Sequence, residues 1–222
     1  MISWIAGEDV TLRPRAWLDG RGCDAWILHT AAEDPLHTAA SWNRHAKATG
    51  DAYAERVDAW VDYYARLGIE SIAYGTVVVH KRSGSGNWTR TAALPPGVLK
   101  PATGHLLQLF AAQELLAEAP GDAILDRRLA LVEHAYVDRT ARVESGGWVE
   151  TSAALRLAAG IEFGVNLDRY GSALVCALDG KEPIRDRLGP LAAELGVPEP
   201  EFAAFAAHLL HHLVEHGFAM PA

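Results

Sequence analysis

Residues 22–42 read GCDAWILHTAAEDPLHTAASW. The nearly continuous apolar run over 23–30 is typical of a strand that is buried on both faces of a sheet. A helix is expected from Asp34-Pro35 to about Ala48, because Asp caps helix N-termini and Pro suits the first helical position. Capping also accounts for Glu33 and Asp34 without a catalytic role. A buried strand followed directly by a helix indicates an α/β domain.

The flanking sequence extends this α/β domain over residues 1–95. Apolar residues at i, i+3 and i+4 spacing predict an amphipathic helix over 51–67, and Gly68 suits its C-terminal end. Ser83-Gly84-Ser85-Gly86 lacks the Lys-Ser/Thr of a phosphate-binding P-loop, so we interpret it as a hairpin turn. The other expected elements are a helix over 8–21, which Pro14 weakens, and hairpin strands over 69–82 and 88–94.

Pro95, Pro96 and Pro101 mark a linker, which predicts a second, accessory domain over 102–222. Its last three expected helices give residues 165–222 the outline of a winged-helix-like unit. The elements expected in this domain are helices over 104–118, 122–133, 172–178, 184–195 and 202–216 and strands over 133–143, 148–157 and 161–167.

The net charge of −8 belongs to the second half of the chain. Residues 1–100 carry 11 Lys/Arg and 11 Asp/Glu, whereas residues 101–222 carry 9 and 17. An acidic half is a poor nucleic-acid surface, because phosphate contacts supply most of the non-specific affinity. Two distant cysteines, Cys23 and Cys176, do not suggest a disulfide framework. The sequence shows no signal-peptide pattern and no membrane-spanning apolar run, so we expect a cytoplasmic protein.

The segment His212-Leu-Val-Glu215-His216 matches H-x-x-E-H, in which two histidines share a helix face and can hold zinc. A zinc hydrolase would take its third protein ligand from elsewhere, normally well downstream, and the sequence ends at Ala222. We therefore interpret the motif as a solvated His-rich face near a helix C-terminus and expect no metal. The solvated face comprises His208, His211, His212, Glu215 and His216, opposite a buried stripe of Phe202, Phe205, Leu209, Leu213 and Val214.

Two further groups of residues could bind a ligand. Basic residues beside an aromatic ring can stack on and clamp an RNA, but they also solubilise an exposed hairpin end, which is the interpretation we favour. Tryptophans can line a substrate pocket, although at helix and strand spacing they more often fill a core. The first group is His80, Lys81, Arg82, Trp88 and Arg90, and the second is Trp17, Trp26, Trp42 and Trp60.

Three segments together resemble one family: residues 22–42, the helix to Gly68 with IESIAYGTVVVHKR, and VNLDRYGSALVCALDGKEPIRDRL. They are similar to the C-terminal portion of actinobacterial class I S-adenosylmethionine-dependent methyltransferases. These enzymes are in turn similar to the ribosomal-RNA guanine and release-factor glutamine methyltransferases. The resemblance implies the late strands of a Rossmann-like sheet over 1–95, a helical insertion over 34–67 and an accessory domain over 102–222. Ser3-Trp4 would then follow an earlier strand, and such sheets carry an antiparallel pair at one edge.

The resemblance does not carry over any cofactor-binding or catalytic residue. The family holds S-adenosylmethionine on an acidic-Gly-x-Gly loop and has an Asn-Pro-Pro-Phe/Tyr motif, both in its earlier half. Here Gly-x-Gly occurs only at Gly20-Arg-Gly22 and Gly84-Ser-Gly86, and no Asn precedes Pro. The chain alone is therefore not expected to bind S-adenosylmethionine tightly.

Two functions follow as hypotheses. The first is the C-terminal part of a methyltransferase acting on RNA or protein, either incomplete or needing a companion chain that carries the cofactor-binding half. The second is a non-catalytic binding or regulatory module on a methyltransferase-derived scaffold. Because a half-sheet leaves an edge and an apolar face uncovered, we also expect self-association or a partner.

Overall fold

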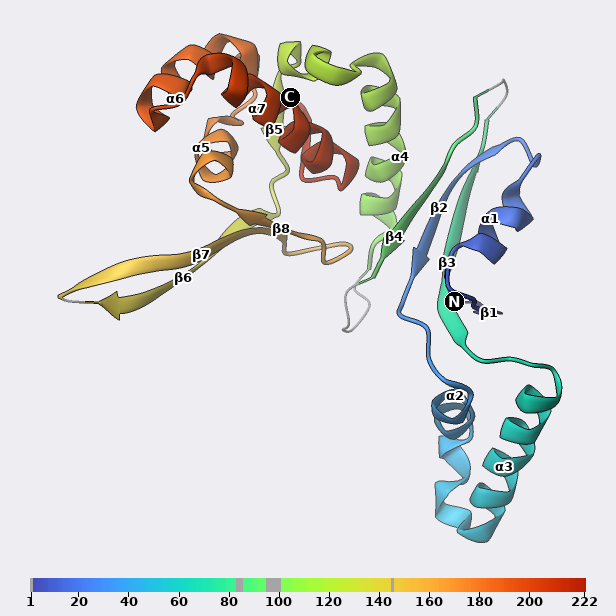
Figure 1. Cartoon of the computed structure of the whole chain (residues 1–222). Coiled ribbons are helices and arrows are strands. Elements are labelled where there is room, and N and C mark those ends of the chain that lie inside the picture. The colour runs from blue at the N-terminus through green and yellow to red at the C-terminus, as the bar shows by residue number, and fades with distance from the viewer. Residues whose placement is uncertain (1, 83–85, 95–100, 145) are drawn as a thin grey trace. The chain divides into compact units, whose positions relative to one another are not determined.

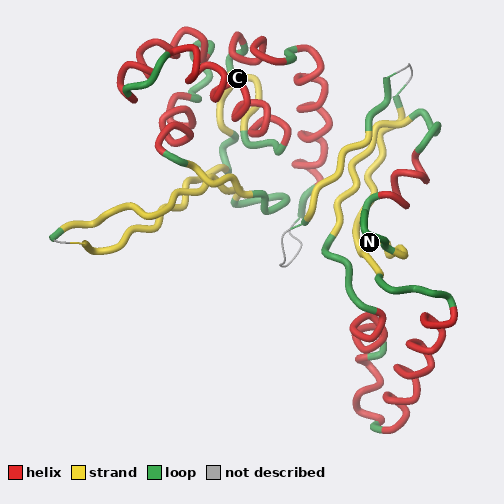
Figure 2. The backbone as a smooth tube through the Cα atoms, in the orientation of Figure 1, coloured by secondary structure: helices red, strands yellow, loops and turns green. Residues whose placement is uncertain are grey.

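The computed structural model of the chain describes residues 2–82, 86–94, 101–144 and 146–222. These residues form a mixed α/β protein that divides into two compact units, Met1–Pro96 and Gly97–Ala222. The division falls in the proline-containing segment where the sequence places the domain boundary. Helices and strands occur in both units (Figure 2). Cys23 and Cys176 are free thiols and belong to different units.

The N-terminal unit is built on a mixed four-stranded sheet with strand order β1-β3-β2-β4 (Figure 1). β3 runs antiparallel to both β1 and β2, whereas β4 runs parallel to β2. β1 and β2 therefore run in the same direction, with an antiparallel strand between them. The strands are β1 (Ile2–Ile5), β2 (Cys23–His29), β3 (Ile72–Lys81) and β4 (Thr89–Ala93).

Strand β2 confirms the buried strand that residues 23–30 predict. Its residues Ala25–Leu28 are at most 4% exposed, because β2 has a neighbouring strand on each edge and is covered on both faces. The contact with β3 is closest at Gly75, which pairs with His29 of β2 and Ile2 of β1. A Cβ atom at Gly75 would lie 2.3 Å from the carbonyl oxygen of Leu28, so this contact requires glycine.

The sheet contains one strand that the sequence did not predict, and one expected pairing is wrong. Ser3-Trp4 lies within the unpredicted strand β1, which pairs with β3 through Ser3↔Tyr74 and Trp4↔Ala73. The strands expected over 69–82 and 88–94 do form, but they do not pair as a hairpin, because β2 lies between β3 and β4. The parallel pairing with β2 buries the apolar run of β2 on its second edge. The expected hairpin turn at Ser83–Ser85 lies outside the described residues.

Helix α1 (Leu12–Leu18) is shorter than the helix expected over 8–21. The Asp9 carboxylate accepts hydrogen bonds from the backbone N–H and the hydroxyl of Thr11, which holds residues 9–11 in a turn before the helix begins. Pro14 is tolerated because it lies in the first turn, where backbone N–H groups have no intrahelical acceptor. The helix ends before Gly20, whose φ of +66° requires glycine or a strained residue.

The helical insertion expected over 34–67 lies between β2 and β3, and its two long helices pack side by side (Figure 1). Asp34 caps α2 as the sequence predicts, because its carboxylate accepts a 2.8 Å hydrogen bond from the His37 backbone N–H. The single helix expected to Ala48 breaks after Trp42 and continues as a 3-10 helix. The insertion contains α2 (Pro35–Trp42), η1 (Arg44–Thr49) and α3 (Asp51–Arg66).

The C-terminal unit packs helices around a core that includes Leu109, Ile124, Leu155, Leu174 and Leu210, all fully buried. Its elements are α4 (Thr103–Glu118), η2 (Gly121–Asp126), β5 (Leu129–Leu131), β6 (Ala135–Glu144), β7 (Gly147–Leu157), β8 (Gly164–Leu167), α5 (Arg169–Ala177), η3 (Ile184–Arg187), α6 (Leu188–Leu195), α7 (Glu199–Glu215) and β9 (Ala219–Pro221).

The C-terminal elements follow the expected order with one error. The helix expected over 122–133 is wrong: η2 and β5 occupy this segment, and β5 pairs antiparallel with β9, which lies about ninety residues later. That distant partner decides the conformation of a short apolar segment that could form either structure. The three expected late helices are present as α5, η3–α6 and α7, and strands β6, β7 and β8 form an antiparallel sheet in that order.

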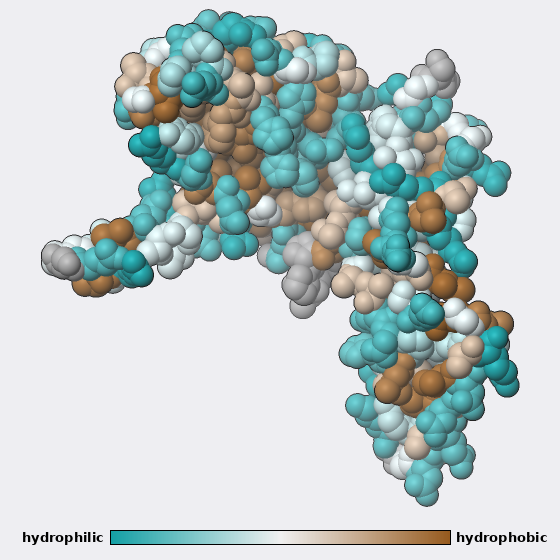
Figure 3. Space-filling model, viewed as in Figure 1, coloured by the Kyte–Doolittle hydropathy of each residue, from teal (hydrophilic) through white to brown (hydrophobic). Residues whose placement is uncertain are grey.

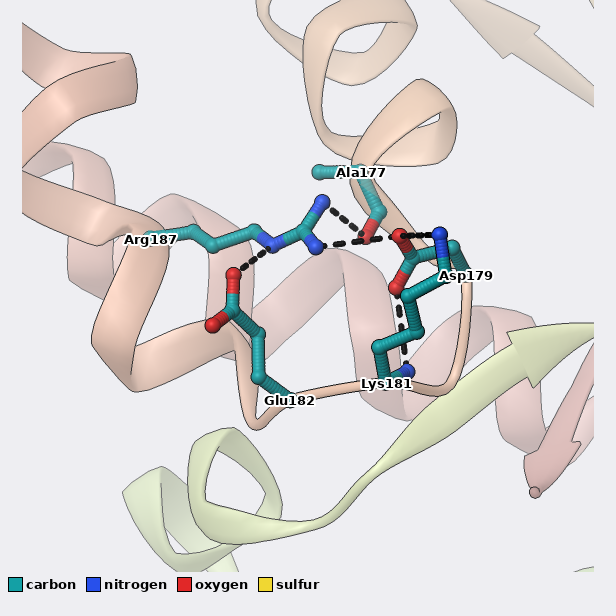
Figure 4. Close-up of polar contacts among 5 residues, drawn as sticks. All are labelled: Ala177, Asp179, Lys181, Glu182 and Arg187. Atoms are coloured by element: carbon teal, nitrogen blue, oxygen red, sulfur yellow. Dashed lines mark hydrogen bonds and ion pairs between the residues drawn. The ribbon is translucent and has the colours of Figure 1, made fainter.

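The turn between α5 and η3 is held by one arginine (Figure 4). The Arg187 guanidinium donates to the Ala177 carbonyl at 3.2 Å, to the Asp179 carboxylate at 3.0 Å and to the Glu182 carboxylate at 2.5 Å. Asp179 also accepts from the Lys181 backbone N–H, and this bond, with Arg187, holds the pKa of Asp179 below its usual value. These polar contacts, together with Leu178, which is 5% exposed, place η3 and α6 relative to α5.

Candidate functional site

A cavity of about 870 Å³ opens in the N-terminal unit. Two of its lining residues, Thr30 and Leu94, directly follow the parallel strands β2 and β4, and the Leu94 N–H donates a 2.7 Å hydrogen bond to the His29 carbonyl. The cavity therefore lies at the carboxyl ends of two parallel strands. This is the edge at which open α/β sheets bind ligands, and the volume is within the range of small-molecule sites.

An aromatic pair from the insertion and the sheet forms one wall of this cavity. The Trp42 indole N–H donates to the Tyr74 hydroxyl at 3.0 Å, and that hydroxyl donates to the Thr38 hydroxyl at 3.2 Å. These bonds fix the pair although Trp42 is 55% exposed. The same pair borders a smaller, mainly apolar cavity of about 360 Å³, to which Trp60 and Tyr64 contribute. An exposed ring fixed in this way can stack against a planar ligand.

Charged groups of both signs line the larger cavity. Glu33 is fixed through its backbone, whose N–H and carbonyl both bond to Ile72, and it precedes the N-cap of α2. Arg44 and His45 come from the first turn of η1. The cavity therefore offers a carboxylate, a guanidinium and an imidazole beside an aromatic wall. This set suits a planar, polar ligand better than an aliphatic one.

The structure separates the four tryptophans that the sequence grouped. Trp26 is 1% exposed and belongs to the core, and Trp17 packs edge-on against the buried Trp4 with ring centroids 6.3 Å apart. Trp42 and Trp60 line cavities. Spacing could not distinguish these roles, because the position of Trp42 depends on its hydrogen bond to Tyr74, a residue of β3. Trp60 packs edge-on against Tyr64 of its own helix, α3.

The basic and aromatic group near β3 and β4 is organised by a buried acid that the sequence analysis did not single out. Asp24 is 2% exposed, forms an ion pair with Arg82 at 3.6 Å and accepts a hydrogen bond from the Trp88 backbone N–H. Trp88 packs edge-on against Trp26. Arg82 and Trp88, two members of the candidate RNA-binding group, thus fix the start of β4 against β2, which argues against an RNA clamp.

The H-x-x-E-H residues come together in the C-terminal unit. One ligand atom each from His212, Glu215 and His216 lies within 4.8 Å of the others, and all three side chains are half-buried. The solvated face expected here is therefore wrong at these positions, although His208 is exposed. Burial lowers the pKa of His212, and the neighbouring His216 lowers it further. Glu215 lies on the same helix face as both histidines, because positions i, i+3 and i+4 are neighbours on a helix surface.

A buried histidine supports this end of α7. The Ile161 backbone N–H donates to Nδ1 of His105 at 3.0 Å, and Nε2 of His105 bonds to the His216 carbonyl at 2.9 Å. Because an N–H only donates and a carbonyl only accepts, the ring is neutral with its proton on Nε2. Burial lowers the pKa of His105, in agreement with that neutral form. Phe163 packs edge-on against both His105 and His216.

Comparison with known proteins places the chain in a family. In the part of the chain that the structure describes, every helix is too short or too polar to span a lipid bilayer. Neither the curated proteins nor the solved structures contain a match to the chain. Residues 107–221, which include His212, Glu215 and His216, match the domain of unknown function DUF7782, and the chain belongs to that family.

Proposed function

We propose that the chain is the C-terminal part of an S-adenosylmethionine-dependent methyltransferase and acts with a segment or companion chain that supplies the cofactor-binding half. The observation that carries this proposal is the strand order β1-β3-β2-β4 of the N-terminal unit. β1, α1 and β2 form a strand-helix-strand unit with two strands in the same direction, and the antiparallel β3 lies between those strands. The resemblance implies an antiparallel pair at one edge of the sheet, and the edge strand β1 pairs antiparallel with β3.

The larger cavity supports a role in binding the methyl acceptor. It lies at the carboxyl ends of β2 and β4, where the reacting groups of an open α/β enzyme would meet. Its aromatic wall of Trp42 and Tyr74, with Arg44 close by, suits a planar acceptor group held by stacking and by hydrogen bonds. We propose that the acceptor, on RNA or protein, enters this cavity.

We do not expect the chain's own glycines to supply a cofactor site. Gly20 and Gly22 lie in the turn between α1 and β2, where their positive φ angles serve a reversal of the chain. Because Asp19-Gly20-Arg21-Gly22 stands at the end of helix α1 and not after a strand, we expect the chain alone to bind S-adenosylmethionine only weakly. Calorimetric titration measures the affinity of the isolated chain for S-adenosylmethionine. Sub-millimolar binding would contradict the proposal that another segment or chain supplies the cofactor-binding half.

The decisive experiment combines the chain with the proposed cofactor-binding half and measures methyl transfer. The DNA upstream of the Met1 codon is read for a glycine loop and an Asn-Pro-Pro motif, and any such segment is co-expressed or fused with the chain. Transfer of a tritiated methyl group from S-adenosylmethionine to RNA and protein fractions is then measured. Activity that appears only with both parts supports the proposal, whereas no transfer from the complete pair rejects it.

A matched pair of variants tests the acceptor cavity in the complete enzyme. Arg44→Ala removes a cavity guanidinium, whereas Arg56→Ala removes an exposed one from α3 of the same insertion. We expect Arg44→Ala to lower methyl transfer at limiting acceptor about tenfold without changing cofactor affinity, and Arg56→Ala to have no effect. Equal activity of the two variants would exclude Arg44 from acceptor binding.

The end of the β6–β7 hairpin favours the alternative of a binding or regulatory module. Val143, Trp148 and Val149 are 66%, 75% and 43% exposed, and hydrophobic residues gather on the surface there (Figure 3). An exposed apolar cluster of this kind is typical of a contact surface. Under this alternative, residues 165–222 act as a winged-helix-like contact unit. Trp148→Ser would then abolish association seen in light scattering, whereas association unchanged by Trp148→Ser would argue against this surface.

A further inference from the structure

The C-terminal end of α7 presents three potential metal ligands on one helix face. His212, Glu215 and His216 stand at i, i+3 and i+4, and their ligand atoms lie within 4.8 Å of one another. A zinc ion with bonds of about 2.0–2.2 Å brings its ligands to about 3.3 Å apart, so small side-chain rotations would close the group around an ion. All three residues lie in the segment that matches DUF7782.

Hydrogen bonding already orients one of the two imidazoles. Nδ1 of His216 bonds to the His212 carbonyl at 3.0 Å, and because the carbonyl can only accept, Nδ1 carries the proton. The neutral ring then has its free lone pair on Nε2. A ligand histidine whose other nitrogen donates to a carbonyl is the usual supporting arrangement in protein metal sites.

The surroundings hold the site in place and favour a cation. Phe163 packs against the His216 ring with centroids 4.9 Å apart, and Nε2 of His105 bonds to the His216 carbonyl. The site lies at the C-terminus of a 17-residue helix, where the aligned peptide dipoles give a partial negative charge. The half-buried position excludes much of the water that competes for a metal at an exposed histidine pair.

We propose that His212, Glu215 and His216 bind one divalent transition-metal ion of the Zn²⁺ class, with one coordination position left open. Two imidazoles and a carboxylate suit zinc and not magnesium or calcium, which prefer oxygen ligands. Three protein ligands and an exchangeable fourth position are the arrangement of catalytic zinc sites. The site lies in the C-terminal unit and does not depend on the proposed methyltransferase function.

The test uses the untagged full-length chain, because an affinity tag of histidines would itself bind zinc. After treatment with a chelator and its removal, Zn²⁺ is titrated by calorimetry, and Co²⁺ is used as a spectroscopic substitute. We expect one ion per chain with micromolar affinity or better, and visible Co²⁺ absorption bands of a low-coordinate site. Absence of saturable zinc binding by the wild-type chain would overturn the proposal.

Matched variants on the same helix locate the site. His212→Gln and Glu215→Gln each remove one ligand with little change of volume, and each should weaken Zn²⁺ binding more than about 100-fold, because loss of a supporting partner alone costs 10–100-fold. His208→Ala, at an exposed position one turn earlier, is the control and should bind as the wild type does. Circular dichroism confirms that each variant folds. Zinc binding that survives both ligand variants, or that His208→Ala removes, would place the ion elsewhere and reject the proposal.

Discussion

Replacing Gly75 with alanine tests the sheet topology on which the proposed function depends. Gly75 lies in β3 between β1 and β2, and an added Cβ would lie 2.3 Å from the Leu28 carbonyl oxygen and 2.7 Å from the buried ring of Trp4. An ordinary contact between these atoms is about 3.4 Å, so β2 and β3 would have to separate by about 1 Å. The backbone carbonyl cannot rotate away as a flexible side chain can.

The loss in the free energy of unfolding can be estimated from that separation of β2 and β3. Widening the ladder by about 1 Å should cost about two ladder hydrogen bonds, among them the one from the Thr30 N–H to the Tyr74 carbonyl, at about 1 kcal/mol each. Over-packing against the Trp4 ring adds about 1–3 kcal/mol. We therefore expect Gly75→Ala to lower the free energy of unfolding of the N-terminal unit by about 3–5 kcal/mol, which is a large fraction of the stability of a typical domain.

Urea unfolding followed by tryptophan fluorescence measures this loss, because six of the seven tryptophans lie in Met1–Pro96. Gly7→Ala is the control: its Cβ would have no atom within 4 Å, so its unfolding free energy should change by less than about 0.5 kcal/mol. If Gly75→Ala were as stable as Gly7→Ala, then β2 and β3 would not approach each other as described. The strand order that supports the methyltransferase proposal would then be refuted as well.

Two further predictions concern the C-terminal unit. His105→Ala leaves the Ile161 N–H and the His216 carbonyl without their hydrogen-bond partner, so it should lower the free energy of unfolding by about 2–4 kcal/mol. The Ile161 amide should then exchange its hydrogen faster, and unchanged exchange would mean that the ring does not hold that amide. The pKa of Asp179 is lowered in the folded chain, so its stabilising effect is complete above the unfolded value of 3.8 and is lost as the pH falls below it. Acid unfolding of the wild type should therefore show a loss in that range that Asp179→Asn does not show, and identical profiles would contradict the Arg187 contact.

Local patterns in the sequence predicted most elements but not how they pair. The apolar run of β2, the Asp34 cap of α2 and the end of α3 at Gly68 follow from residue types and spacing. The β1 strand was missed because four residues at the edge of a sheet carry little periodic signal. A β3–β4 hairpin was expected because strands that follow each other in the sequence usually pair. In the structure β4 pairs instead with β2, which comes before β3 in the chain.

For the candidate sites too, the sequence identified residue types but not the contacts between distant residues. Trp42 and the H-x-x-E-H residues were recognised as types that can bind a ligand, but the sequence favoured core packing for the one and solvation for the other. The wall of the larger cavity depends on a hydrogen bond between residues 32 positions apart in the chain, and the orientation of the His216 end of α7 depends on His105, 111 positions away. Spacing along one element contains no information about such contacts.

The sequence by itself determined that residues 22–42 form a buried strand and a capped helix, because burial on both faces and N-capping are properties of neighbouring residues. It also predicts that the chain lacks a glycine loop for S-adenosylmethionine, and this stays a prediction. Only the tertiary structure decided that β3 and β4 lie on opposite edges of β2, that Trp42 lines a cavity, and that His212, Glu215 and His216 are half-buried together. Those features result from contacts between segments that are distant in the sequence, and such contacts form only when the chain has folded.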